Sequence, residues 1–561
     1  MEYSAIVFEP YRIGGMAAMN ESGNNTEYNG GKPEVNIIGA GLAGLSAALT
    51  LARMDIPCRL ISPMPSERAQ SVMAEGGINA SLDTMGESDS PDEHFADTMK
   101  GGVYLADPNA VWNLCSNAPK TVEMLCSLGA ALKMKDGKLV LRNFGGQKKK
   151  RTAYAKSSTG KILMTALIDA VRRYEAEGIV KRYSHHRLYS FDIADGNCRG
   201  IDVNDLHTGR LIRMNGSVIL ASGGMNSLFP GLTTGSTVNT GDVTAMAFIN
   251  GVEIANPEFI QYHPTTFPIT GKRCLVSEAA RGEGGRLFAL RKGEPWYFME
   301  EKYPELGNLM PRDVVSREIE LVKVDKDCDG HVYLDMTGLD RLVWSDKLSD
   351  LREECIRFLG TDPAIKPVEV SPGIHYFMGG INVDEKHRTN ISRLYAAGEC
   401  ACQYHGANRL GGNSMLGAVF GGYTAACTAA SEADENNTGI EELSQCRREI
   451  MQPVGIPDEA AKLLRDSLGI FRSGETLEAA EERMQELIEG EKNELQKRRM
   501  ILGRAVLLAA QNRKESRGAH TRTDYPEKDD VNFRRTTIVT YSEKEITVSL
   551  RDIPEKRGES G

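Results

Sequence analysis

The apolar positions of this chain predict alternating strands and helices near its beginning. A short apolar run, Val35–Ile38, is followed by the turn GAGLAG and by a longer run of small and apolar residues that ends at Arg53. A second short apolar run, Cys58–Ile61, follows. Short apolar runs beside glycine turns are typical of buried strands, and the longer run between them is typical of a helix. The order predicts the start of a βαβ unit in a parallel sheet.

Two later apolar runs predict further strands of the same sheet. Val218–Leu220 precedes ASGG, and Leu394–Ala397 precedes Gly398-Glu399. Both join an apolar run to a glycine turn, so we expect them to end at the edge where Val35–Ile38 ends. The segment between roughly Pro257 and Ile374 then becomes an insert, and the predicted fold class is α/β with a discontinuous first domain.

The pattern takes a helical period after about residue 441. Apolar residues stand at helical spacing among many Glu, Lys and Arg residues, notably Leu477, Ala480, Met484, Leu487 and Ile488. This spacing predicts amphipathic helices that pack as a small bundle. The polar end of the chain contains two strand-like runs, Thr536–Tyr541 and Ile546–Leu550.

Composition narrows the function classes. With 561 residues the chain exceeds one core, so several domains are expected, and its net charge of -10 argues against a nucleic-acid binder. The eleven cysteines show no CxxC array or ferredoxin spacing, so we expect no iron–sulfur cluster, structural zinc or other metal in this chain. Such unpatterned cysteines fit a reducing compartment. The polar residues 1–32 lack the features of an export signal and predict a disordered tail.

The glycine turn after the first strand predicts a dinucleotide site. Gly39, Gly41 and Gly44 have the GxGxxG spacing that lets backbone approach a pyrophosphate at a helix N-terminus. The acid that usually binds the ribose of NAD is replaced by Ser62. Two more glycine turns carry acids, Asp242 and Glu399, which could bond ribityl or ribose hydroxyls or could simply cap helices. Together these features favour FAD.

A set of basic residues lies in glycine- and proline-rich segments of the second half: His263, Arg281, Arg312, His375 and Arg409. Long cationic side chains on such turns suit a small anionic ligand, because guanidinium groups and backbone can both approach it closely. The pattern therefore favours a small dicarboxylate. Each residue also has a simpler explanation, since Arg281 could pair with Glu283, Arg312 could pair with Asp313, and His263 could fix a turn before Pro264.

The chain resembles the flavoprotein subunits of the succinate dehydrogenase/fumarate reductase family from about residue 35 to residue 530. The motifs that carry this resemblance are, in order, AEGGINAS, FGGQ, TGD, EFIQYHPT, SEAARGEGG, PRDVVSR, HYFMGGI, AAGEC, HGANRLGGNS and SRGAHTRTDYP. The resemblance implies a Rossmann-like FAD-binding domain (33–257 and 375–435) with an inserted α+β capping domain (258–374). A helical domain (436–515) and a C-terminal segment (516–561) are implied to follow.

The resemblance also implies where substrate binds, between the flavin and the capping domain. His375 and Arg409 would bind one carboxylate beside the backbone of Gly412. His263 and Ser277 would bind the other, and the family usually has Thr where Ser277 stands. Burying two negative charges without partners would cost about several kcal/mol or more. Donors at both ends of the substrate remove this cost.

For the reaction, the resemblance implies that a hydride passes from flavin N5 to one alkene carbon of fumarate while Arg312 protonates the other. Arginine has a pKa above ~12, so this acid must act on a strongly basic carbanion. Glu278 and Arg281 would resupply the proton. The residues implied to hold FAD are Gly39, Gly41, Gly44, Ser62, Ser71, Gly76, Gly77, Asp242, Glu399 and Ser414.

Two departures from family patterns carry predictions. Gln70 stands where membrane-bound members have the histidine that links to the flavin, so we expect FAD to be non-covalent and fumarate reduction to outrun succinate oxidation. L-aspartate oxidase shares many of the motifs but has a glutamate before Gly-Gly that pairs with the substrate ammonium. Here Phe144 takes that position, and an apolar ring disfavours aspartate.

Other activities and partners stay open at this point. The alternatives to a fumarate reductase or succinate dehydrogenase are an L-aspartate oxidase, a reductase of another enoate such as urocanate, and a non-catalytic FAD scaffold of a larger complex. Because the chain has no metal relay of its own, we expect a separate iron–sulfur subunit, and a membrane anchor would act through that partner. A cytoplasmic location follows, peripheral to the inner face of the cytoplasmic membrane if such an anchor exists.

Overall fold

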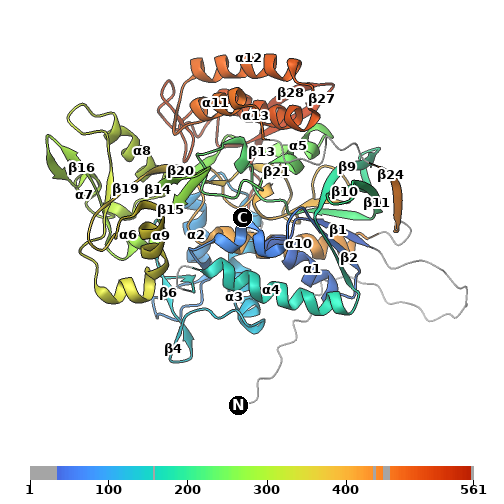
Figure 1. The fold of residues 1–561 in the computed structure, drawn as a ribbon, viewed down its shortest axis with the longest axis horizontal. Helices are drawn as coiled ribbons and strands as arrows, with labels where there is room; N and C mark the ends of the chain where they lie inside the picture. The colour runs from blue at the N-terminus through green and yellow to red at the C-terminus, as the bar shows by residue number, and fades with distance from the viewer. Residues whose placement is uncertain (1–33, 156–157, 434–437, 446–454, 557–561) are drawn as a thin grey trace, which may run out of the picture.

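The computed structural model of the chain describes residues 34–155, 158–433, 438–445 and 455–556. The tail predicted at 1–32 lies outside these residues. Four regions surround the centre of the molecule in Figure 1: helices α1–α4 below, an insert at the left, helices α11–α13 at the top and a small sheet at the right.

A five-stranded parallel sheet forms the base of the fold. Its order is β22-β12-β1-β2-β8. The strands span Leu394–Ala396, Ser217–Leu220, Val35–Ile38, Cys58–Ser62 and Val180–Ser184. The βαβ start and both later strands predicted from the apolar runs are therefore confirmed, as is the α/β class. Strands β22, β12 and β1 are neighbours, so their glycine turns meet at one edge.

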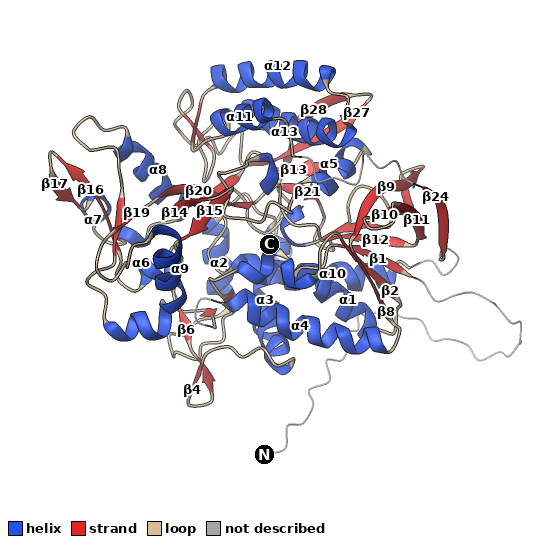
Figure 2. Cartoon of the chain, viewed as in Figure 1, coloured by secondary structure: helices blue, strands red, loops and turns tan. Residues whose placement is uncertain are grey.

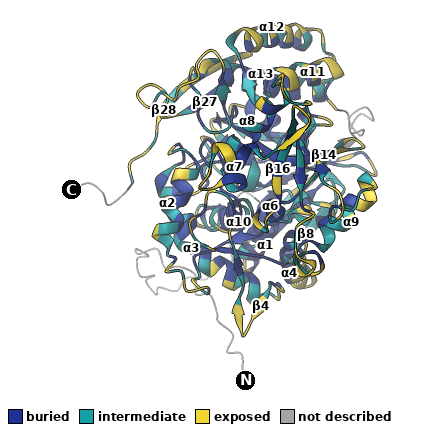
Figure 3. Cartoon of the chain, turned by 90° about the vertical axis from the view of Figure 1, so that its left-hand side faces the viewer, coloured by how far each residue is buried: buried dark blue, intermediate teal, exposed yellow. Residues whose placement is uncertain are grey.

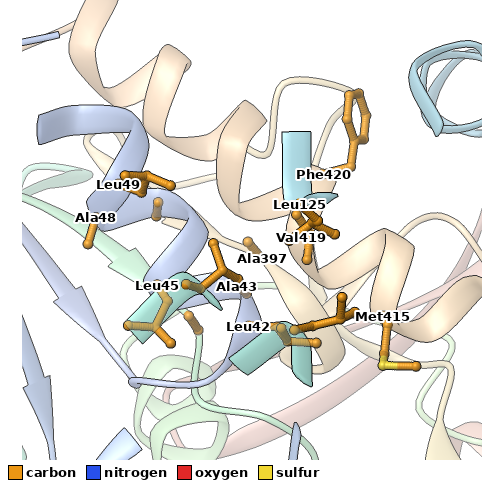
Figure 4. Packing of buried hydrophobic residues seen from close by; sticks show 14 of the residues in the cluster. Leu42, Ala43, Leu45, Ala48, Leu49, Leu125, Ala397, Met415, Val419 and Phe420 are labelled. Atoms are coloured by element: carbon orange, nitrogen blue, oxygen red, sulfur yellow. The ribbon is translucent and has the colours of Figure 1, made fainter. Parts of the chain in front are cut away.

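Helix α1 (Leu42–Arg53) follows the glycine turn and packs against α10 (Asn413–Ser431). The contact is so close that a Cβ at Gly422 would lie 2.1 Å from the carbonyl oxygen of Ala43. Leu42, Leu45 and Leu49 of α1 and Met415 and Val419 of α10 belong to one buried core, which Figure 4 shows. Helix α4 (Thr159–Ala176) also packs against α1, and α3 (Pro108–Ser127) against α10.

The insert has its own core and leaves the main body at the left of Figure 2. Strand β14 (Ile260–Ile269) lies between β15 (Lys272–Leu275) and β20 (Ser371–Phe377). A second sheet has the order β17 (Glu294–Trp296), β16 (Arg286–Arg291), β18 (Tyr333–Asp335), β19 (Val368–Glu369). The helices of the insert are α6 (Glu278–Gly282), α7 (Phe298–Lys302), α8 (Arg312–Lys323) and α9 (Ser349–Leu359).

Helices α11 (Asp458–Ser467), α12 (Gly474–Gly490) and α13 (Glu494–Asn512) form the predicted bundle. Leu477, Ala480, Met484 and Ile488 are buried, and the outer face of α12 is exposed in Figure 3. One part of the predicted helical pattern is wrong, because residues 440–445 form strand β24 (Ile440–Gln445). This strand pairs with β11 (Arg210–Asn215) beside β10 (Asn197–Asp205) and β9 (His186–Ala194).

The two strand-like runs near the end are confirmed as β27 (Arg535–Ser542) and β28 (Glu545–Asp552). They join a sheet of order β23-β21-β13-β27-β28, which ties the end of the chain to β13 (Ile254–Ala255). In the short basic run at 148–151, Arg151 is buried and paired with Asp89 and Asp97.

Candidate functional site: a cavity between a nucleotide fold and its cap

A cavity of about 660 Å³ runs from the glycine turn after β1 to the facing side of the insert. At its first end lie the turn after β1, the end of β2 and the start of α10. At its other end lie residues of β14, α6, α8 and β20. The cavity includes nearly every residue predicted to hold cofactor or substrate; Gly44 and Arg281 do not line it.

The first end of the cavity has the form of a pyrophosphate site. Gly39 has φ +117°, and a Cβ there would lie 2.1 Å from the oxygen of Ala221. A Cβ at Gly44 would lie 1.8 Å from the oxygen of Gly39, so both positions require glycine. Helix α1 begins without a side-chain cap or an acidic residue in its first turn. Its backbone N–H groups therefore suit a phosphate, and this donor set fits FAD.

Several other predicted cofactor residues line the same cavity. Ser71 Oγ accepts a hydrogen bond from the backbone N–H of Leu42 at 3.3 Å, and Ser62 donates to the oxygen of Met64 at 2.6 Å. Ser414 lies in the first turn of α10, which begins after Gly412 at φ +84° and also has no side-chain cap. Gly76 and Gly77, also predicted to hold the cofactor, line the same cavity.

The two acids predicted to bond FAD hydroxyls differ in their surroundings. Burial raises the pKa of Glu399 to about 7, although its carboxylate accepts a hydrogen bond from Phe377 N at 3.2 Å. A ligand hydroxyl that donates a hydrogen bond to this carboxylate would stabilise its charged form and offset the cost of burying it. Asp242 begins helix α5 (Asp242–Ile249), and its carboxylate is bound by Arg498 of α13 at 2.6 and 2.5 Å and by Arg499 at 3.4 Å. Asp242 thus joins the helical bundle to the cavity wall.

At the opposite end, the cavity brings together all four side chains predicted to bind the two carboxylates: His263, Ser277, His375 and Arg409. The His263 and His375 rings meet edge to face with centroids 5.3 Å apart. His263 Nε2 and Arg409 Nε are buried without a hydrogen-bond partner among the residues that the structure describes. Buried donors without partners are costly, so their presence here is typical of a site that binds a polar ligand.

The two histidines correct one sequence expectation. They were grouped with the arginines as cationic, but burial and then the charge of Arg312 hold the pKa of each ring well below its usual value. His375 is further affected by Arg409, and His263 by His375 and Arg281. Both rings are therefore neutral near pH 7, and the positive charge of the site comes from arginine.

Arg312 pairs with Glu278 and not with its chain neighbour. Its Nε donates to Glu278 Oε2 at 2.9 Å and its Nη2 lies 2.8 Å from the same oxygen. Asp313 instead pairs with Arg317, so the simpler explanation of Arg312 is wrong. Burial alone would raise the pKa of Glu278, but the charges of Arg312 and Arg281 hold it below its usual value. Glu278 is therefore ionised, and it keeps Arg312 beside the cavity.

Arg281 makes no direct hydrogen bond with Glu278 in the described residues, although a residue that passes protons to Arg312 through Glu278 would be expected to do so. Its Nη1 donates to the backbone oxygen of Asn308 at 2.5 Å, while no described residue forms a hydrogen bond with Nε or Nη2. It acts on Glu278 through charge and does not line the cavity. Glu283 pairs with Lys347, so the simpler pairing of Arg281 with Glu283 is also wrong.

Phe144 closes the wall between the two ends of the cavity. A Cβ at Gly411 would lie 3.1 Å from the Phe144 side chain, and a Cβ at Gly76 would lie 3.4 Å from its ring. The Arg142 guanidinium stacks 5.1 Å from the ring centroid and donates to the oxygen of Gly76. The next residue, Gly145, donates its backbone N–H to Glu278 Oε1 at 2.7 Å. This loop therefore links the cofactor side of the cavity to the insert.

Sequence reasoning missed several residues that line the cavity. Tyr376 holds Arg409, whose guanidinium lies 4.6 Å from the ring centroid, and Arg68 lies near the end of β2. Thr234 contacts the ring of His375. Tyr376 follows His375 directly and Thr234 belongs to a TTG turn shortly before TGD, so proximity to a predicted motif was the available signal.

The fold and this cavity define an FAD-binding oxidoreductase, and comparison with known proteins identifies its family. A model described as FAD binding domain matches residues 34–415, and one described as Fumarate reductase flavoprotein C-term matches residues 491–557. The chain belongs to the succinate dehydrogenase/fumarate reductase flavoprotein family, whose members are FAD-dependent oxidoreductases.

Three relatives indicate the range of that family. The succinate dehydrogenase flavoprotein subunit of Bacillus subtilis is 38% identical over 549 residues, covering 90% of this chain and 93% of the relative. The 8-methylmenaquinol:fumarate reductase flavoprotein subunit of Wolinella succinogenes is 34% identical, with coverage of 90% and 88%. The L-aspartate oxidase of Streptomyces coelicolor is 31% identical, with coverage of 93% and 94%.

Solved structures agree with this assignment. A quinol-fumarate reductase with menaquinol molecules superposes with a TM-score of 0.82 at 28% identity, covering 94% of this chain and 99% of that one. Mycobacterium smegmatis Sdh1 in complex with UQ1 gives 0.78 at 29% identity, with coverage of 93% and 95%. In the described part of this chain, no helix is long and apolar enough to cross a membrane.

Proposed function

We propose that this chain interconverts fumarate and succinate and favours fumarate reduction. The observation that carries the proposal is the set of donors at the insert end of the cavity. Within the described part of the chain, His263 Nε2 and Arg409 Nε are buried without partners. His375 lies beside His263, and Arg312 has its own carboxylate partner, Glu278. Two neutral N–H donors and two arginines suit the two carboxylates of a small diacid.

In this proposal each end of the diacid has its own donors. His375 and Arg409 bind one carboxylate, near the backbone N–H groups at the start of α10 after Gly412. His263 and Ser277 bind the other. The insert contributes His263 and Ser277, whereas α10 belongs to the predicted FAD-binding domain. The substrate is therefore held between the two parts of the chain, and water is excluded from it.

Arg312 is the proposed proton donor. When bound, FAD exchanges a hydride with one alkene carbon of the substrate. Arg312 then protonates the other carbon, and its contact with Glu278 gives a route by which the proton is replaced. Arg281, which affects Glu278 through charge, is proposed to complete this route through solvent, since no direct hydrogen bond joins the two side chains in the described residues.

L-aspartate oxidase is the second candidate, since a relative of that name covers most of the chain. Phe144 argues against it, because its ring packs between Gly76 and Gly411 and offers no negative charge to a substrate ammonium. An aspartate-dependent formation of peroxide that is faster than fumarate reduction would favour the oxidase instead.

FAD is proposed to be bound without a covalent link, because the amide of Gln70 is not a nucleophile. Its oxygen accepts a hydrogen bond from the backbone N–H of Ser236 at 2.5 Å. We expect acid precipitation of the protein to release all the yellow colour into the supernatant. Without the electron-withdrawing link, succinate oxidation should also be slower than fumarate reduction. A fluorescent flavin band that stays with the polypeptide on a denaturing gel would contradict the first expectation, and equal rates would contradict the second.

Electrons are proposed to come from a separate iron–sulfur subunit, with any membrane anchor supplied through it and with a cytoplasmic location for this chain. Two relatives are themselves named as flavoprotein subunits. Purification from the native source should recover such a partner. Recovery of the chain alone, active with NADH, would count against it.

The proposed function is tested by reducing the purified chain with dithionite and following its reoxidation. Fumarate should reoxidise it rapidly, whereas crotonate, a monocarboxylate of similar shape, should act poorly because one set of donors is left unpaired. Urocanate and oxygen serve as comparisons. Equal rates with crotonate and fumarate, or no reoxidation by any unsaturated acid, would rule the proposal out.

A further inference from the structure

The hydroxyl of Thr234 contacts one ring nitrogen of His375. Thr234 Oγ1 lies 2.8 Å from His375 Nδ1, and the two residues are 141 positions apart in the chain. Both line the cavity. No hydrogen bond from a described residue reaches the other ring nitrogen, Nε2. The ring is thus held at Nδ1, and Nε2, which no described residue uses, is left for a ligand in this cavity to bind.

The loop that carries Thr234 is fixed on both sides. The Thr234 N–H donates to the oxygen of Ile374 at 2.8 Å, and Ile374 N–H donates to the oxygen of Leu232 at 2.9 Å. The following turn is fixed by Ser236, whose N–H donates to the side-chain oxygen of Gln70 at 2.5 Å. Thr234 is itself buried. Its hydroxyl also lies 3.4 Å from the oxygen of Ile374, a longer contact than the 2.8 Å to His375 Nδ1, so the ring nitrogen is its nearer partner.

A neutral imidazole carries one N–H, and the partner at one nitrogen decides which nitrogen it occupies. If Thr234 donates its hydroxyl hydrogen to Nδ1, the ring proton is on Nε2, and Nε2–H donates to a carboxylate. If the ring proton were on Nδ1, Nε2 would direct a lone pair at a negatively charged oxygen. The charged and titratable groups that face the ring are Arg312, Arg409 and His263. They keep it neutral, so its tautomer matters.

We propose that Thr234 is a positioning residue that fixes His375 as the Nε2–H tautomer and so makes it a hydrogen-bond donor to the substrate. The inference rests on the proposed function, because it takes a carboxylate to be the ligand at His375. Gln70, through Ser236, anchors the loop from which Thr234 acts. The amide at this position then has a structural use where other members of the family have the linking histidine.

Two variants separate the hydroxyl from the shape of the side chain. Thr234→Val removes the donor and keeps the volume, while Thr234→Ser keeps the donor. We expect Thr234→Val to bind fumarate about 10-fold or more weakly, since a hydrogen bond to a charged group is lost, and Thr234→Ser to stay near the wild type. The change should appear in KM more than in kcat. If Thr234→Val does not retain FAD, Thr234→Ala gives the same comparison.

Coupling and pH show whether the effect passes through His375. In a His375→Ala background, Thr234→Val should cause no further loss. Between pH 8 and pH 6, the ratio of the two fumarate affinities, wild type to Thr234→Val, should stay constant, because burial and the charges of Arg312 and Arg409 hold the pKa of His375 well below its usual value and the ring stays neutral. Equal fumarate affinity in Thr234→Val and the wild type, or a full additional loss in the His375→Ala background, would overturn the inference.

A readout without substrate keeps this inference separate from the proposed function. The ring nitrogens of ¹⁵N-labelled histidine, assigned to His375 by the signal that His375→Gln removes, report the tautomer directly. The wild type should carry the proton on Nε2 and Thr234→Val should shift toward Nδ1. A wild-type ring with its proton on Nδ1 would overturn the inference, whereas a wild-type chain that does not bind fumarate would overturn the proposed function alone.

Discussion

Replacement of Arg312 with Gln is expected to lower the rate of fumarate reduction by about 100-fold or more while FAD stays bound. Arg312 lines the cavity, and its Nη1 donates to the side-chain oxygen of Gln261 at 3.1 Å in addition to its two contacts with Glu278. Gln keeps a polar side chain of moderate length but has no acidic proton. The rate is measured by stopped-flow reoxidation of the dithionite-reduced protein.

Two comparisons make that result specific. Arg286→Gln removes an arginine from the exposed surface of the insert, where it pairs with Glu300, and should leave the rate unchanged. Glu278→Gln should slow turnover by weakening the hold on Arg312 while the proton donor remains. An Arg312→Gln protein that turns over at a near-normal rate would show that the proton comes from elsewhere.

The strands of the nucleotide fold could be predicted because their signal is local. Val35–Ile38, Ser217–Leu220 and Leu394–Ala396 are each fully buried and each ends at a glycine turn. A strand buried on both faces requires a continuous apolar run, so pattern and structure coincide. Strand β24 was missed because residues 440–445 are polar and pair at the edge of a small sheet, where no apolar run is required.

The members of the site could also be predicted, but their pairings could not. The motifs placed His263, Glu278, Arg312 and Arg409 around one ligand, and all four line the cavity. That Arg312 contacts Glu278, while Asp313 contacts Arg317, depends on which face of α8 turns inward. Likewise, the two histidines are neutral because they are buried beside arginines. Neither their burial nor these neighbours can be deduced from the order of residues in the sequence.

Arg151 shows the same limit outside the site. It closes a run of four basic residues, a pattern typical of a solvated loop, yet it is buried with two aspartates around it. Those aspartates lie 62 and 54 positions earlier in the chain, so the partners that stabilise the charge carry no local signal. Long-range pairing of this kind also determines the stability of the region where three parts of the chain meet.

The last expectation concerns that region, where Glu258 and Arg513 are both buried with no exposed side-chain surface. Arg513 Nε donates to Glu258 Oε1 at 2.7 Å, and Arg513 also contacts Glu515, which in turn contacts Arg517. Glu258 stands just before β14, while Arg513 follows α13. The pair therefore joins the start of the strand that carries His263 to the end of the helical bundle.

Glu258→Gln should lower the free energy of unfolding by about 3 kcal/mol, because it removes one of the two buried carboxylates that pair with Arg513 and leaves this charge only partly compensated. The measurement is urea unfolding of the FAD-loaded protein, followed by tryptophan fluorescence. Glu459→Gln, which removes one member of an exposed pair with Arg483 on the bundle surface, should have little effect.

If the loss comes from an uncompensated charge, adding Arg513→Met to Glu258→Gln should restore most of the stability, since replacing both members of a buried pair is often close to neutral. A double variant that is as unstable as the sum of both single variants would show instead that each side chain stabilises the fold through its other contacts, and that the pairing itself contributes little.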